Sequence, residues 1–234
     1  MTNATEEFGE AYWEEMYRGR DAVWSGRPNP QLVTEIADLT PGAALEAGCG
    51  EGADAIWLAE RGWRVTAVDI SETALGRARA HAETRGAEVA GRITWVRADL
   101  TDATPDGTPF DLVTTHYVHT TASRETLFRR LAAAVAPGGT LLVVGHHETD
   151  PRAEAFAAEH PGVHFTAEDV AADLVPDDWD VVVAEVRTRL APVGHEPHAH
   201  DGDGDGDGDG DGNGDGGHGG PVEHHDAVLR ARRR

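Results

Sequence analysis

The sequence contains no lysine, a single cysteine and no long apolar run. Without lysine the protein cannot form a Schiff base with a carbonyl substrate, and it has neither a lysine general base nor the lysine of a Walker-type phosphate loop. Because Cys49 has no second cysteine to pair with, an intramolecular disulfide and a thiolate metal cluster are also excluded. Any catalytic chemistry must come from other side chains.

Neither a membrane span nor a secretion signal is indicated. No stretch reaches the roughly 18 apolar residues that a membrane helix needs, and the acidic start MTNATEE lacks the pattern of a signal peptide. The 234 residues suit one domain with a sizeable core. We therefore expect a soluble, cytoplasmic protein without a membrane partner.

Positive charge is scarce as well. The 20 basic residues are all arginine and face 42 acidic ones, which gives a formal net charge of −22. Nucleic-acid binding needs clustered basic side chains that neutralise phosphates. The balance therefore argues against a nucleic-acid partner, even though a low-complexity segment at 194–221 holds much of the acidity.

A glycine-rich turn at residues 44–52 follows an apolar strand and opens a helix. Gly48, Gly50 and Gly52 alternate, so the backbone can bend sharply and approach a ligand closely. A dinucleotide fold expects G-x-G-x-x-G at this place, whereas this turn reads E-x-G-x-G-x-G. The carboxylate of Glu46 suits a cationic or amine-bearing ligand and would repel a pyrophosphate.

This turn resembles motif I of the class I S-adenosylmethionine (SAM)-dependent methyltransferases, whose cofactor carries an amino group and a sulfonium charge but no phosphate. The resemblance implies that Gly48, Cys49, Gly50 and Gly52 line the methionine and ribose part of SAM. It also implies that Glu46 contacts the amino end of SAM, directly or through water. The product would be S-adenosylhomocysteine.

Two further acids end the next two predicted strands. Asp69 is placed to accept hydrogen bonds from both ribose hydroxyls, which suits NAD as well as SAM, so the glycine spacing decides between the two cofactors. The resemblance implies that Ile70 lies against the adenine and that Asp99 accepts from its exocyclic amine. By the same resemblance, the backbone of Leu100 meets the adenine ring.

The periodicity predicts an alternation of helices and strands. Helices are expected at 3–18, 31–39, 53–61, from 71 onward, 123–136 and 167–175. Strands are expected before the glycine turn and at 64–70, 93–100, 110–119, 140–147, 179–190 and 226–234, with a turn at Pro137-Gly138-Gly139. The resemblance implies an α/β, Rossmann-like, doubly wound seven-stranded sheet in the order 3-2-1-4-5-7-6 with strand 7 antiparallel.

Four regions follow from this pattern. They are an N-terminal helical arm (1–40), the SAM-binding core (41–190), a disordered His/Asp-Gly-rich insertion in the last hairpin (191–225) and the final strand (226–234). Six Asp-Gly pairs fill 201–212, and such a segment cannot bury enough apolar surface to order itself. Its histidines and carboxylates suit weak binding of nickel, zinc or calcium, and no specific metal site is predicted.

The arm is rich in aromatic residues. These side chains either cover the sheet or, as in similar small methyltransferases, fold over the SAM pocket. Tyr12, Trp24 and Asn29 are the candidates for the second role. An aromatic face beside the sulfonium would contribute roughly 0.5–2 kcal/mol of cation–π energy.

Catalytic candidates follow the fourth and fifth strands. Methyl transfer needs orientation and, for a weakly acidic acceptor, a base. His116, Tyr117 and His119 leave the fourth strand, and His119 is the candidate general base. Alternatively, His116 contacts SAM only through its backbone, and His146 and His147 merely satisfy loop polar groups.

The sequence predicts a methyltransferase with a small-molecule acceptor, such as a thiol, a chalcogen oxyanion or a hydroxylated metabolite. Motifs for methylating nucleic-acid bases are absent, and the layout is most similar to the tellurite-resistance and thiopurine type of methyltransferase. One alternative is metal sequestration or sensing by the 195–225 segment. An NAD-dependent oxidoreductase is disfavoured by Glu46 and the glycine spacing. The patterns specify no oligomeric state.

Overall fold

The computed structural model describes residues 7–102, 109–151, 163–191 and 222–234. The strands are β1 (Ala43–Ala47), β2 (Arg64–Asp69), β3 (Ile93–Arg97), β4 (Phe110–His116), β5 (Val135–His146), β6 (Trp179–Ala191) and β7 (Val222–Arg233). The helices are α1 (Glu10–Arg18), α2 (Pro30–Glu35), α3 (Ala53–Glu60), α4 (Glu72–Thr84), α5 (Ala87–Ala90), α6 (Arg124–Ala133) and α8 (Ala167–Ala172).

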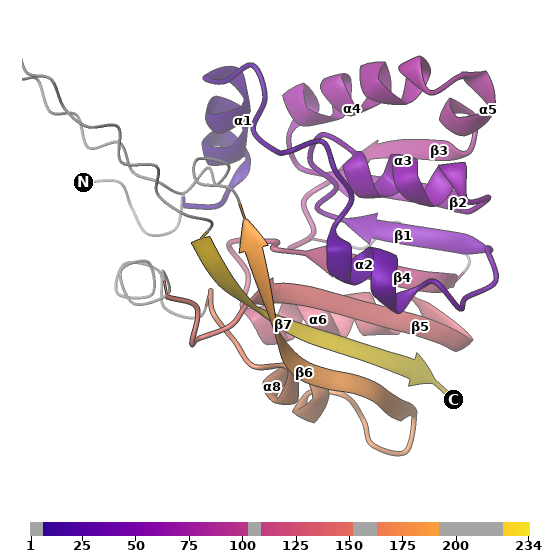
Figure 1. The fold of residues 1–234 in the computed structure, drawn as a ribbon, viewed down its shortest axis with the longest axis vertical. Helices are drawn as coiled ribbons and strands as arrows, with labels where there is room; N and C mark the ends of the chain where they lie inside the picture. The colour runs from indigo at the N-terminus through magenta and orange to yellow at the C-terminus, as the bar shows by residue number, and fades with distance from the viewer. Residues whose placement is uncertain (1–6, 103–108, 152–162, 192–221) are drawn as a thin grey trace, which may run out of the picture.

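The strands form one seven-stranded sheet in the order β3-β2-β1-β4-β5-β7-β6. Strands β1 to β5 pair in parallel, and β7 runs antiparallel to both β5 and β6. Figure 1 shows α2 and α3 in front of the sheet and α6 behind it. The predicted Rossmann-like fold with its antiparallel seventh strand is therefore confirmed.

Each face of the sheet carries its own apolar core. Side chains of α6 and α8 pack on one face around Leu131 and Val170, and α2 and α3 pack on the other around Leu32 and Leu58. The inner strands are buried on both faces, which explains their nearly continuous apolar sequence. Because parallel strands end at one edge of the sheet, the glycine turn and the ends of β2, β4 and β5 lie along that edge.

The first predicted helix is shorter than expected. Among the described residues, α1 begins at Glu10, and residues 7–9 form a turn. Phe8 has a φ of +62°, which a right-handed helix cannot contain. The second helix, α2, begins at Pro30 and already ends at Glu35, four residues before the predicted end.

Two strands are longer than predicted. Strand β5 begins at Val135, so Pro137-Gly138-Gly139 is an irregularity within the strand, where the pairing with β4 shifts register, rather than a turn before it. Strand β7 begins at Val222 rather than at residue 226. The missed residues include the exposed Glu223 and the buried His224, and these polar residues concealed the strand pattern.

The last hairpin is paired along its described length, from Trp179 with Arg233 to Ala191 with Val222. The repeat at 201–212 lies outside the described residues, as does most of the segment predicted to be disordered and of the segment on which the metal-binding alternative rests. Residues 222–225, which belong to both predicted segments, are instead ordered as the start of β7. None of the helices in the described parts of the chain has the length and apolar character that a membrane crossing requires.

Candidate active site

The backbone of the glycine turn is held by hydrogen bonds within the protein. The amides of Gly48 and Cys49 donate to the carbonyl of Val68 at 2.8 and 2.9 Å. The amide of Gly50 donates to Oδ2 of Asp69 at 2.7 Å. A phosphate-binding loop instead presents its amides to the ligand, so this turn is not arranged for a pyrophosphate.

Glycine is required in the turn because the backbone is left-handed and closely covered. Gly50 has a φ of +51° and Gly52 a φ of +81°. A Cβ on Gly50 would lie 2.9 Å from the Tyr17 hydroxyl and 3.1 Å from Nε1 of Trp24, and one on Gly52 would lie 2.7 Å from the Trp95 ring. The two glycines are therefore closely covered by other side chains of the protein, and the side chains over Gly50 belong to the arm.

The arm is fastened by Glu51, a residue of the turn itself. Its carboxylate accepts the backbone N–H groups of Val23 at 3.2 Å and Trp24 at 3.1 Å. It also pairs with Arg77 of α4 at 2.9 Å, and Arg77 donates to the carbonyl of Tyr17 at 2.7 Å. Together with the 2.8 Å hydrogen bond from Nε1 of Trp24 to the Tyr17 hydroxyl, these contacts hold two aromatic side chains over the turn.

A second set of hydrogen bonds joins α1 to the start of α4. Glu14 accepts hydrogen bonds from the hydroxyls of Ser71 at 2.7 Å and Thr73 at 2.6 Å. Burial alone would raise the pKa of Glu14, but these hydrogen bonds, with Arg18 nearby, outweigh it and lower the pKa to about 2. The arm is thus attached to α4 at two places, through Glu14 in the middle of α1 and through Tyr17 in its last turn.

Acidic groups cluster around Glu46, at the start of the turn. Glu46 is only 3% exposed, and its Oε2 has no hydrogen-bond partner among the described residues. Burial, with the negative charges of Asp54 and Asp69, raises the pKa of Glu46 well above its ordinary value. One ligand atom each of Glu46, Asp54 and His116 lie within 4.8 Å of one another. This arrangement can accept one cationic group, either an ammonium or a metal ion.

Asp69 lies at the end of β2, as predicted. Its Oδ1 accepts the amide of Ser71 at 2.9 Å and its Oδ2 that of Gly50 at 2.7 Å. Burial raises its pKa, while these N–H groups act in the opposite direction. Each carboxylate oxygen can accept a second hydrogen bond, so Asp69 retains the capacity to bind two hydroxyl groups.

The other residues predicted to bind the cofactor lie in varied surroundings. Ile70 packs against the aromatic cluster of the arm. Asp99 accepts the amide of Thr101 at 2.8 Å, and Leu100 is buried with its carbonyl accepting from Arg130 at 3.2 Å.

Three residues predicted to contact the cofactor have structural contacts of their own. Tyr12 packs edge-on against Phe8 with ring centroids 5.4 Å apart. Asn29 caps α2, because its Oδ1 accepts the amide of Gln31 at 2.9 Å. Burial, with the charges of Asp69 and Glu46, raises the pKa of Cys49, so this thiol is a small buried side chain and not an activated nucleophile.

Two of the catalytic candidates point into the protein. His116 has Nδ1 2.7 Å from Oδ2 of Asp54 and Nε2 2.8 Å from the Thr114 hydroxyl. Burial and the charge of Asp226 raise the pKa of Tyr117 well above the usual value, and Tyr117 has a φ of +52°. The contacts of His116 fix its ring, but they do not direct either ring nitrogen toward an acceptor.

His119 has different surroundings. Its ring lies 5.3 Å from that of Phe8 and 6.4 Å from that of His146, with which it is stacked. The His146 ring in turn lies 4.6 Å from that of Tyr117. His147, by contrast, accepts the amide of Thr149 in its own loop at 3.1 Å. The structure thus groups His119 and His146 with aromatic rings at the edge of the sheet where β4 and β5 end.

Four residues of this region escaped the sequence-based prediction of the site: Tyr17, Glu51, Asp54 and Arg77. Only Asp54 had a usable signal, because it is an acid in the first helical turn after the glycines. The partners of Glu51 and Arg77 lie 26 or more residues away along the chain, so no local pattern could reveal them.

Comparisons with known proteins identify the family of this chain. Residues 44–139 match the methyltransferase domain family. The chain is 30% identical over 163 residues to 2-heptyl-1-hydroxyquinolin-4(1H)-one methyltransferase of Mycobacteroides abscessus, a match that covers 68% of each chain.

Similar solved structures include TehB from Haemophilus influenzae, with a TM-score of 0.60, 17% identity and coverage of 96% of this chain and 67% of that one. They also include the N-methyltransferase NodS from Bradyrhizobium japonicum with bound S-adenosylhomocysteine, with a TM-score of 0.61, 19% identity and coverage of 94% and 98%. The chain therefore belongs to the class I SAM-dependent methyltransferases, and SAM is its cofactor.

Proposed function

We propose that this methyltransferase acts on a small aromatic molecule and methylates a weakly acidic hydroxyl group. The observation that carries the proposal is the position of His119, between the ring of Phe8 and the ring of His146. A histidine can accept a proton near neutral pH, and the neighbouring rings provide an apolar surface for a flat acceptor. The ring of His116, by contrast, is held by Asp54 and Thr114.

The residues of the turn fit SAM at its amino end. The unpartnered Oε2 of Glu46, with Asp54 beside it, supplies acceptors for an ammonium group. Asp69 would hold the ribose hydroxyls, and Asp99 would accept from the adenine amine. When bound, SAM supplies an electrophilic methyl group. Among the predicted aromatic contacts, Trp24 has the strongest support, because its indole lies directly over Gly50.

His119 would act as general base and take the proton of the acceptor hydroxyl. General bases of this kind contribute about 10²–10⁴-fold to a rate. The Mycobacteroides abscessus relative is named for a hydroxyquinolinone, which is a flat ring system with a hydroxyl group. Thiols and chalcogen oxyanions remain as other acceptor classes, and neither one needs an aromatic binding surface.

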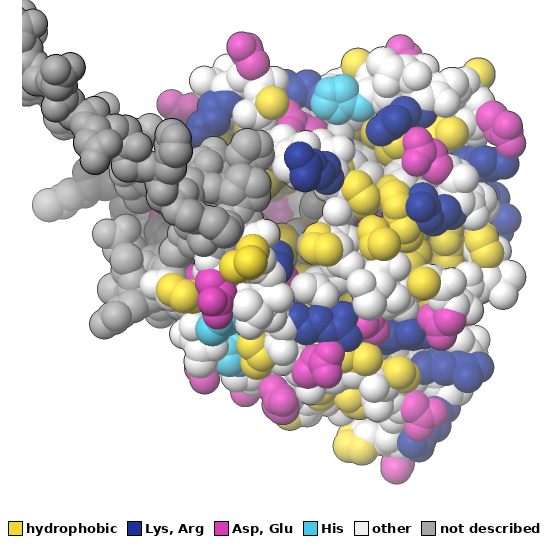
Figure 2. All heavy atoms as spheres, in the orientation of Figure 1, with side chains coloured by type: hydrophobic (Ala, Val, Ile, Leu, Met, Phe, Trp, Pro, Cys, Tyr) yellow, Lys and Arg dark blue, Asp and Glu magenta, His cyan; other side chains and the backbone are white. Residues whose placement is uncertain are grey.

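An RNA acceptor is disfavoured by charge. Some relatives in the family are named as RNA methyltransferases, but this chain has a net charge of −22. On the face shown in Figure 2, arginines alternate with acidic side chains and form no continuous basic stripe. Without such a stripe, contacts to a phosphate backbone would be few.

The test is a methyl-transfer assay with labelled SAM and four acceptors: 2-heptyl-1-hydroxyquinolin-4(1H)-one, thiophenol, tellurite and a short RNA. We expect transfer to the hydroxyquinolinone and a loss of about 10²–10⁴-fold in His119→Gln, with unchanged affinity for S-adenosylhomocysteine. His225→Gln, on β7, is the matched control and should keep the rate. Transfer only to thiophenol, tellurite or RNA would overturn the proposal.

A further inference from the structure

Strand β6 forms an open edge of the sheet. It is 13 residues long, and in the described part of the chain it pairs only with β7. It also exposes four large apolar side chains, with Val181 48%, Val182 54%, Val186 45% and Leu190 67% exposed. Long edge strands with apolar side chains are normally covered, because their free backbone groups pair readily with another strand. Figure 1 shows β6 as the last strand of the sheet, beside β7.

The charges along β6 specify how it could pair with a second copy of itself. In a symmetric antiparallel pair, one residue lies opposite its own copy, and the others pair at equal distances on either side. A centre at Glu185 or at Arg187 would set like charges opposite each other, and a centre at Thr188 would set Arg187 opposite Arg189. With Val186 at the centre, Glu185 of each strand lies opposite Arg187 of the other strand.

The same register also covers the apolar side chains. Val186 meets its own copy at the centre of the pair. Leu190 lies opposite Val182 of the partner strand, and both side chains are exposed. Val182 lies where the pairing of β6 with β7 shifts register, between Val181 and Val183. Cross-strand apolar and opposite-charge pairs each contribute roughly 0.2–1 kcal/mol. Among the centres from Glu185 to Thr188, the charge pattern and the apolar pattern thus favour Val186.

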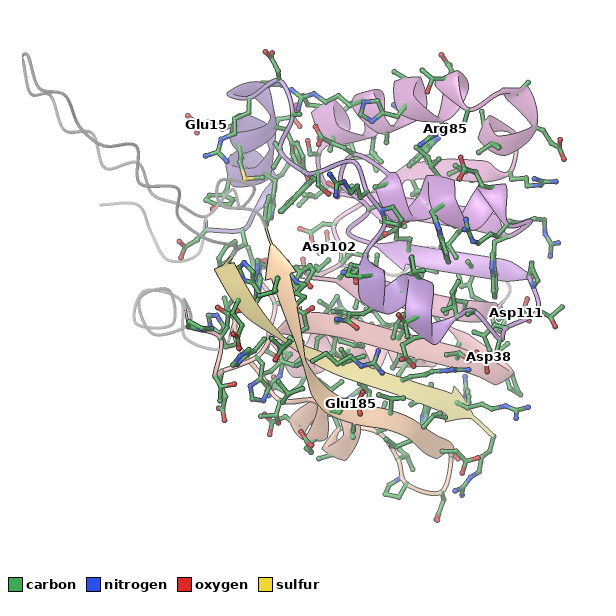
Figure 3. The ribbon with its side chains drawn as sticks, viewed as in Figure 1. Glu15, Asp38, Arg85, Asp102, Asp111 and Glu185 are labelled. Atoms are coloured by element: carbon green, nitrogen blue, oxygen red, sulfur yellow. The ribbon has the colours of Figure 1, made fainter. Side chains whose placement is uncertain are left out.

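We propose that two copies of this chain associate through antiparallel pairing of β6 about Val186 and join their sheets into one. Glu185 lies on β6 in Figure 3, and it already pairs with Arg187 of its own chain at 2.6 Å. In the dimer each carboxylate also faces the guanidinium of the partner strand. This interface is separate from the proposed acceptor site, so the two proposals can fail independently.

The first test is the molar mass from light scattering over a dilution series. The wild-type chain should show about twice the mass of a monomer, and Val186→Lys and Glu185→Arg should show the monomer mass, because each places like charges across the pair. Val175→Lys is the matched control, since Val175 is 56% exposed but lies outside β6. A monomer mass for the wild type at all concentrations, or a dimer that survives both β6 substitutions, would overturn the proposal.

The second test checks the register. Opposite residues in an antiparallel pair have Cα atoms about 4.5–5.5 Å apart, which suits a disulfide. The native Cys49 is buried, so the background is low. Under oxidation, Val186→Cys should form a covalent dimer, and Thr188→Cys should not, because its opposite residue is Ala184. Cross-linking at residue 188 but not at 186 would contradict this register.

Discussion

Nδ1 of His116 lies 2.7 Å from Oδ2 of Asp54, and the other oxygen of that carboxylate accepts the backbone N–H of Asn29 at 2.6 Å. One partly buried acid thus joins the end of β4, the first turn of α3 and the start of α2. A second acid lies near Tyr117, the residue after β4: Asp226 raises the pKa of Tyr117, together with burial, and accepts a hydrogen bond from Gln31 at 3.1 Å. The arm therefore contacts both acids that lie near the end of β4.

Replacing Asp54 should destabilise this junction. Asp54→Ala leaves the His116 ring and the Asn29 amide without their acceptor, and each unsatisfied buried group costs about 1–3 kcal/mol. Asp54→Asn should cost less, because its amide oxygen can still accept one hydrogen bond. Urea unfolding measures the difference. Asp102→Ala, at an exposed residue labelled in Figure 3, is the control; an Asp54→Ala variant as stable as this control would show that the junction contributes nothing.

Glu46 should make stability depend on pH. Because burial raises the pKa of its carboxyl, the folded protein holds this proton more tightly than the unfolded chain does. The resulting stability is present below the unfolded pKa of about 4.3 and is lost as the pH rises toward the folded pKa. Glu46→Gln removes this loss.

The melting temperature of Glu46→Gln, relative to wild type, should therefore increase from about pH 5 to about pH 8. Scanning fluorimetry over this range measures it. Glu15→Gln, on the exposed face of α1, is the control. Its melting temperature should differ from that of wild type by the same amount at every pH. A constant difference between Glu46→Gln and wild type at all pH values would mean that Glu46 is already ionised in the folded protein.

The role of Asp69 can be tested by separating binding from stability. Asp69→Asn keeps an oxygen acceptor but loses the charge, and a charge-assisted hydrogen bond contributes roughly 1.5–3 kcal/mol. We expect its affinity for S-adenosylhomocysteine, measured by calorimetry, to fall at least about tenfold. Asp69→Ala should also lower the melting temperature, because the amides of Gly50 and Ser71 lose their acceptor. Unchanged affinity in both variants would remove Asp69 from the cofactor site.

The position of Asp69 could be predicted because it follows from local patterns, whereas the strand order was implied by the family resemblance that the glycine turn carries. Apolar runs, a glycine turn and an acid at a strand end are each visible within about ten residues. The surroundings of His116 could not be predicted in this way. Its ring is held by Asp54, and that contact exists only once α3 packs beside β4. The start of β7 was missed because His224 is buried beside Asp150, with Nδ1 3.2 Å from Oδ2, and a buried polar residue interrupts the apolar alternation.

The arm shows the same limit of local patterns. Its aromatic residues were visible in the sequence, but the place where they pack was not. The contact that positions them joins Glu51 to Val23, which lies 28 residues away along the chain. The sequence offered Glu51 only as an acid within the glycine turn. The structure shows that the turn holds the arm through this side chain, which explains why Tyr17 and Trp24 lie over Gly50.

Removing the carboxylate of Glu51 should therefore release the arm while leaving the domain folded. In Glu51→Ala the amides of Val23 and Trp24 lose their acceptor, and Arg77 loses its ion pair. Hydrogen-exchange mass spectrometry should show faster exchange in the 19–26 segment and unchanged exchange in α6.

Glu51→Gln distinguishes the two contributions of this residue, since its amide oxygen can still accept from the arm backbone but cannot form the ion pair. We expect intermediate exchange in this variant, and wild-type exchange in Glu15→Ala, which alters an exposed glutamate of α1. The Trp24 indole should also become more exposed in Glu51→Ala, which shifts tryptophan emission to longer wavelength. If exchange at 19–26 stays at the wild-type rate in Glu51→Ala, the arm is held by the contacts of Glu14 with α4, and Glu51 is not its main attachment.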